Sequence, residues 1–173
     1  MNKFKNSSLS FEIKNSSDFF NKLIQEYEDF DKQHLNPRHA INCAITSWHL
    51  TDWTYHEFYR TDDRFQDYEK VDKKGGVKRI SGLTRYQQFT LKQCGELEYM
   101  KLIANGSKHC LLNDKSLSQK TQISQGDHAA YDFNRHDFNV PRFEIEIDDN
   151  TKVDFEQALV ATMKYWESLL SQH

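Results

Sequence analysis

Residues 36–60 read NPRHAINCAITSWHLTDWTYHEFYR. Asn36 is a good helix N-cap, and Pro37 suits the first helical position because its missing amide would have no partner there. No Gly or Pro follows until Gly75, so the spacing predicts a helix that runs unbroken to Arg60, about 36 Å at roughly 1.5 Å per residue. Its apolar residues spread around most of the circumference: Ile41, Ile45, Trp48, Leu50, Trp53 and Phe58. A helix that is apolar on nearly all sides belongs in the centre of a helical bundle.

Further helices are predicted on both sides of this central one. Apolar residues recur at helical spacing over residues 18–33, behind a Ser-Ser-Asp start signal, and over 81–103 behind a capping serine. Gly95 is a point where that second helix bends or splits. A last helix is predicted over 155–170, because the Asp before it and the Gln three residues later form a capping box.

The remaining segments are polar or alternating. Residues 142–148 alternate apolar and acidic side chains, which predicts a strand with one solvated face. A short strand is also predicted at 9–13. Residues 61–78 indicate a solvated loop or a short frayed helix, and 111–141 show no sustained period and predict an irregular loop. The expected fold is a single domain, mainly α: a four- to five-helix bundle with a small β-hairpin or strand element before the C-terminal helix.

Composition narrows the functional classes. Lys and Arg number 23 against 26 Asp and Glu, for a formal net charge of -3, which argues against general DNA binding and leaves a local basic patch open. Three cysteines without C-x-x-C spacing argue against a zinc finger or a disulfide framework and favour a reducing, cytoplasmic setting. The N-terminal residues lack the apolar core of a signal peptide, and no stretch resembles a membrane span.

One candidate site lies on the central helix. His49, Asp52 and His56 fall within about 80° of helical arc at 100° per residue, which suggests a metal site. The two histidines are seven residues apart, roughly 10 Å along the axis, so one ion cannot take both from a straight helix. The alternative is a carboxylate that hydrogen-bonds to one histidine inside a mostly apolar interface.

A second candidate is the segment IANGSKHCL at residues 103–111. Asn105-Gly106 is a strong helix breaker, so the helix is expected to stop there, with Lys108 and His109 complementing the negative end of its dipole. If the helix instead continues, Lys101, Asn105 and His109 form a polar stripe that could hold a phosphate or transfer a proton.

Together these motifs carry a resemblance. The pairing of WHLTDW (48–53) with ANGSKH (104–109), followed by a strand and a helix ending in YWESLL (165–170), resembles a group of uncharacterised bacterial proteins over roughly residues 37–170. More distantly it is similar to the HEPN superfamily of helical bundles. Many of its members are metal-independent ribonucleases in toxin–antitoxin and phage-defence systems.

The HEPN motif is an arginine, a polar residue that is often Asn, three variable residues and a histidine. Asn105 and His109 match the last two positions, but Ala104 stands where the family has its arginine. That arginine contacts the scissile phosphate, and Lys101 lacks its bidentate fork. The resemblance therefore implies a non-catalytic member of the superfamily rather than a nuclease.

The long segment 111–141 is a third candidate. It carries Asp127-His128, Arg135-His136-Asp137 and the aromatic residues Tyr131, Phe133 and Phe138. Such residues could stack on a nucleotide or dock a partner, or they could pin the loop to the bundle. The sequence thus favours a cytosolic interaction protein, with a protein partner or self-association and no cofactor. The alternatives are an RNA-cleaving enzyme that uses Asn105, His109 and Lys101, and a metal-dependent hydrolase.

Overall fold

A computed structural model describes residues 11–71, 73, 75–108, 120–124, 141–148 and 151–173. In chain order its elements are α1 (Ser16–Lys32), α2 (Pro37–Thr54), a π-helical turn (Tyr55–Tyr59), a 3-10 turn (Asp63–Phe65), β1 (Tyr68–Val71), β2 (Val77–Ile80), α3 (Gly82–Gln93), α4 (Leu97–Lys108), β3 (Lys120–Ser124), β4 (Arg142–Asp148), β5 (Thr151–Asp154) and α5 (Phe155–Leu170). The described chain is mainly helical, with two small antiparallel sheets. One of them ends in a strand hairpin, β4–β5, directly before α5, as predicted.

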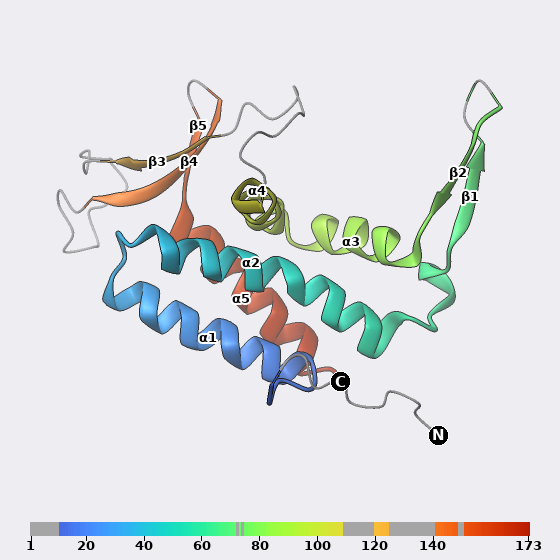
Figure 1. Cartoon of the computed structure of the whole chain (residues 1–173), viewed down its shortest axis with the longest axis horizontal. Coiled ribbons are helices and arrows are strands. Elements are labelled where there is room, and N and C mark those ends of the chain that lie inside the picture. The colour runs from blue at the N-terminus through green and yellow to red at the C-terminus, as the bar shows by residue number, and fades with distance from the viewer. Residues whose placement is uncertain (1–10, 72, 74, 109–119, 125–140, 149–150) are drawn as a thin grey trace.

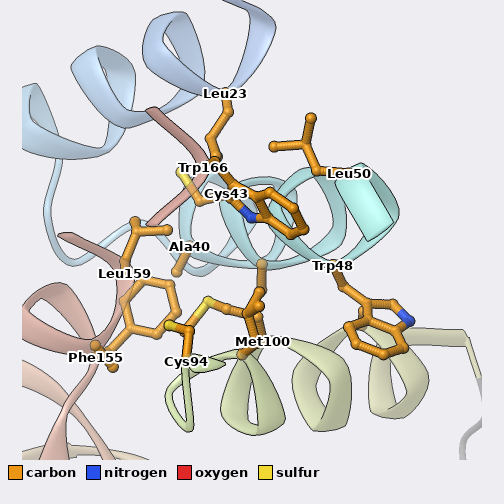
Figure 2. Close-up of a cluster of buried hydrophobic side chains, with 14 of the residues drawn as sticks. Leu23, Ala40, Cys43, Trp48, Leu50, Cys94, Met100, Phe155, Leu159 and Trp166 are labelled. Carbon is orange, nitrogen blue, oxygen red and sulfur yellow. The ribbon is translucent and has the colours of Figure 1, made fainter. Parts of the chain in front are cut away.

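Helix α2 lies at the centre of the helices. It packs against α1, α3, α4 and α5, and in Figure 1 α1 runs alongside it while α5 crosses behind it. Ten of its residues are buried, five apolar and five polar, so the helix is largely covered but less uniformly apolar than predicted. In Figure 2, Leu23 of α1, Met100 of α4 and Trp166 of α5 lie around α2, which itself contributes Leu50. Helix α2 is therefore covered on several sides by the helices that pack against it.

Buried polar groups link α2 to α5 and are paired. The Ser47 and Thr162 hydroxyls lie 2.9 Å apart, and the Trp166 indole donates to the Ser47 carbonyl at 3.1 Å. Because buried polar atoms without a partner are costly, these bonds fix how α5 is seated on α2.

The central helix does not remain α-helical to its expected end. It is regular to Thr54 and then forms the π-helical turn, whose Tyr55 side chain is buried. The chain thus stays helical as far as Tyr59, but the number of residues per turn changes. Side-chain directions taken at 100° per residue no longer hold beyond Thr54.

The other helices follow the sequence with two corrections. Asn15, rather than a serine, caps α1 by accepting from the Asp18 amide at 2.7 Å. The split near Gly95 is confirmed, but the stop expected at Asn105-Gly106 is wrong, because α4 continues to Lys108. Its buried face packs against α2, and this tertiary contact outweighs the local helix breaker.

The second sheet corrects the expected loop. Strand β3 lies within the segment expected to be irregular at 111–141, and it pairs antiparallel with β4 from Lys120 opposite Glu146 to Ser124 opposite Arg142. Strand β3 (KTQIS) is mostly polar and shows no clear alternation in the sequence. It forms a strand because it pairs with β4, which supplies the apolar face of the sheet. The strand expected at 9–13 is not formed by residues 11–13, and the rest of it lies outside the described residues.

Among the described residues, the helices are all too short or too polar to cross a lipid bilayer.

Candidate functional site

The predicted stripe on α2 faces solvent. His49 and Asp52 are exposed, and so is His56 in the π-helical turn. His56 Nε2 lies 3.7 Å from Asp52 Oδ1, with both side chains about half exposed. The apolar interface expected around this pair is therefore wrong, because both side chains lie at the surface.

These three residues do not converge as metal ligands. In the part of the chain that the structure describes, no three His, Cys, Asp or Glu side chains are grouped closely enough to hold a metal ion. A site built on Asp52 and His56 would need its other ligands from elsewhere, as the spacing along the helix already required. Metal binding by this stripe stays a prediction.

The surroundings of His49 lower the pKa of its imidazole. Partial burial lowers its pKa first, and Lys22 and Lys108 lower it further, while Asp52 acts in the opposite direction. This shift favours the neutral imidazole, which can accept a hydrogen bond. Lys22 itself is held by Glu26 and by the Thr46 hydroxyl.

The second predicted segment lies beside the first. The Lys101 ammonium of α4 sits 5.8 Å from the centre of the Trp48 ring of α2, and it donates to Glu98 at 3.0 Å. Asn105, one turn later on α4, is exposed. The WHLTDW and ANGSKH motifs thus occupy adjacent helices. His109 lies outside the described residues, as do the charged and aromatic residues predicted for the long loop: Asp127, His128, Tyr131, Phe133, Arg135, His136, Asp137 and Phe138.

A different surface was missed by the sequence analysis. The segment 61–78, expected to be a loop or frayed helix, contains the 3-10 turn and enters a two-stranded ribbon, β1–β2. The cross-strand pairs are Tyr68 with Ile80, Glu69 with Arg79, Lys70 with Lys78 and Val71 with Val77. Figure 1 shows this ribbon rising from the start of α3, away from the other helices. Its signal in the sequence was the Gly75-Gly76 pair in the short polar stretch between Val71 and Val77. Gly75 adopts a φ of 81°, which favours glycine.

Aromatic side chains hold the base of the ribbon. Buried Tyr55, Phe65 and Tyr86 form a cluster of their own, against which Tyr59 and Phe89 pack. The Phe65 and Tyr86 rings meet edge to face at 5.2 Å, and the Tyr59 ring stacks on Tyr86 at 4.8 Å. The residues come from the π-helical turn, the 3-10 turn and α3, so this cluster, here called the aromatic anchor, ties the start of the ribbon to the helices.

Polar contacts complete the base. Asp67 accepts from the Gly82 amide at 2.7 Å and from Arg79 at 2.6 Å, and these two contacts, in that order, lower the pKa of its carboxyl. Arg85 of α3 donates to the Gln66 carbonyl at 2.8 Å. Both ends of the ribbon are therefore fixed to the beginning of α3, while its tip extends outward.

Comparison with protein families, with curated proteins and with solved structures found no match to this chain.

Proposed function

We propose that this chain is a non-catalytic, cytosolic helical-bundle protein that binds a macromolecular partner through the β1–β2 ribbon. The observation that carries the proposal is the ribbon's exposure. Tyr68, Val71 and Val77 are 44%, 64% and 63% exposed, and they are three of the six large apolar residues that the described chain leaves exposed. An isolated two-stranded ribbon with open edges gains little stability from itself and offers backbone groups and side chains for recognition.

The contacts that hold the base of the ribbon support this function. A loop without a role would not need the aromatic anchor and the two-sided Asp67 contact that hold β1 and β2 in place. Holding an exposed element in one geometry lowers the entropy cost of binding. Ala104 in place of the HEPN arginine is consistent with binding rather than cleavage. The HEPN resemblance would place such a protein in a toxin–antitoxin or phage-defence setting.

The experiment compares Val71→Ser/Val77→Ser with wild type and with Ile123→Ser, a control that removes a 53% exposed apolar side chain from β3. Native mass spectrometry measures self-association, and affinity capture with quantification measures other partners. We expect the ribbon variant to lose the complex and the control to keep it. If the wild type shows no self-association and captures no partner, the proposal is refuted.

A second function has one observation in its favour. Because α4 runs through Asn105-Gly106, Lys101 and Asn105 lie four residues apart on one continuous helix, the arrangement required for a phosphate-handling or RNA-cleaving stripe. Incubation of purified protein with total RNA, beside His109→Ala, tests it. Identical RNA profiles for the two proteins would reject cleavage of RNA.

A further inference from the structure

One face of the ribbon has the chemistry of a single-stranded nucleic-acid site. We propose that the face carrying Tyr68, Lys70 and Lys78 binds single-stranded nucleic acid, with the lysines on phosphates and the tyrosine ring stacked on a base. This inference rests on the proposed function, since it names the partner class of the same ribbon.

The register places these side chains together. Residues directly opposite in an antiparallel pair share a face, and successive residues alternate between faces. Tyr68 and Lys70, with Ile80 and Lys78 opposite them, therefore share one face. The other face carries Glu69, Val71, Val77 and Arg79. The basic and apolar sides of the ribbon tip are thus separated.

The lysines of this face repel one another. Lys70 and Lys78 are directly opposite, a placement that destabilises a two-stranded ribbon. Within the described ranges neither of them, nor Lys73 in the connecting turn, has an ion-pair partner, whereas Asp67 is already engaged by Arg79 and the Gly82 amide. A polyanion laid along the face would relieve this repulsion.

The charge is local to this part of the chain. Residues 60–85 contain eight Lys or Arg and five Asp or Glu, in a protein whose formal net charge is -3. The ribbon is therefore a basic region on an acidic protein, which orients a polyanion toward the ribbon and away from the helices.

The aromatic ring favours a single strand. The Tyr68 ring is 44% exposed, and the Arg85 guanidinium lies 5.1 Å from its centre, at the base of the lysine face. Bases stack on such rings only when they are free of a duplex, and an arginine nearby adds a cation–π contribution. A phosphate backbone running from Arg85 along Lys70 and Lys78 toward Lys73 would place one base over Tyr68.

The test is fluorescence anisotropy with a labelled 20-nucleotide single-stranded RNA of mixed sequence, titrated with the full chain at several salt concentrations. The variant Lys70→Ser/Lys78→Ser is compared with Lys92→Ser/Lys164→Ser, which removes the same charge from exposed positions on α3 and α5. For the ribbon variant we expect the negative slope of log K against log salt to become shallower by about 1.4. Its affinity at 0.1 M salt should fall about 25-fold, and the control variant should change little. Tyr68→Ala should weaken binding about fivefold or more without changing the slope.

Each other outcome overturns a stated part. No binding by the wild type, or equal losses in the ribbon and control variants, rejects the inference. Duplex DNA of equal length bound as tightly as the RNA rejects the stacking role of Tyr68. If the wild type forms a complex with a protein partner that Val71→Ser/Val77→Ser loses, and the wild type does not bind RNA, the proposed function stands and only the nucleic-acid inference fails. A cooperative thermal unfolding transition confirms that each variant is folded.

Discussion

Gly82 is a position where one added methyl group should disturb the base of the ribbon. It is the first residue of α3 and is buried, and its amide donates to Asp67. A Cβ built there overlaps the Phe65 carbonyl oxygen and the Tyr55 hydroxyl, and lies 3.1 Å from the Phe65 carbonyl carbon. The obstacle is backbone of the 3-10 turn, whose Phe65 ring is 3% exposed in the aromatic anchor. It cannot rotate aside as a flexible side chain would.

We therefore expect Gly82→Ala to destabilise the protein. Overpacking of this kind costs about 1–3 kcal/mol, and the helix propensity gained by alanine returns up to about 1 kcal/mol. A net loss of about 1.5 kcal/mol corresponds to a Tm lower by roughly 3–6 °C for a chain of this length.

Thermal and urea unfolding followed by circular dichroism measure the effect. Gly95→Ala is the matched control, since nothing lies within 4 Å of a Cβ at Gly95 and its φ is not positive. We expect its stability to change by less than about 0.5 kcal/mol. A Gly82→Ala protein as stable as Gly95→Ala would refute the close packing of α3 on the 3-10 turn.

Three further predictions concern buried and titrating groups. Tyr86→Phe removes a buried hydroxyl that lies 2.9 Å from a threonine hydroxyl of α2, so it should cost about 1 kcal/mol in urea unfolding, and no loss would contradict that bond. Burial raises the pKa of the Cys43 and Cys94 thiols to about 12 and about 11. The third cysteine, Cys110, lies outside the described residues and is replaced in this experiment. The folded Cys110→Ser protein should not react with a thiol reagent at pH 8 until denaturant is added. The lowered pKa of His49 means that the unfolded chain binds its proton more readily, so stability should fall as the pH drops below about 6.5 toward the folded value. His49→Gln should show a smaller loss between pH 7 and pH 5, and an equal loss would assign the acid sensitivity to other groups.

The helices could be predicted because their signals are local. Asn36 and Pro37 start α2, and Asp154 caps α5 by accepting from the Gln157 amide at 2.8 Å. Where a tertiary contact determines the end of a helix, the prediction from the sequence was wrong. Asn105-Gly106 would end an isolated helix, but the packing of α4 on α2 carries the helix past it.

The candidate site was predicted only in part, for a related reason. The grouping of His49 and Asp52 on one strip of α2 follows from helical spacing, and His56 lies 3.7 Å from Asp52 although it belongs to the π-helical turn. Whether that strip faces solvent depends on which neighbours cover the helix. The ribbon was missed because its strands are only four residues long and bury no apolar face. The aromatic anchor that holds it joins Tyr55, Phe65 and Tyr86, which are up to 31 positions apart in the chain.

The most direct test of the ribbon as the binding element is an amide NMR titration of the isotope-labelled full chain with the 20-nucleotide RNA. The account predicts that peaks of residues 68–80 and Arg85 shift, while those of α1 and α5 stay in place. Shifts confined to the surface shared by α2 and α4, around His49 and Lys101, would contradict it and support the RNA-handling stripe instead.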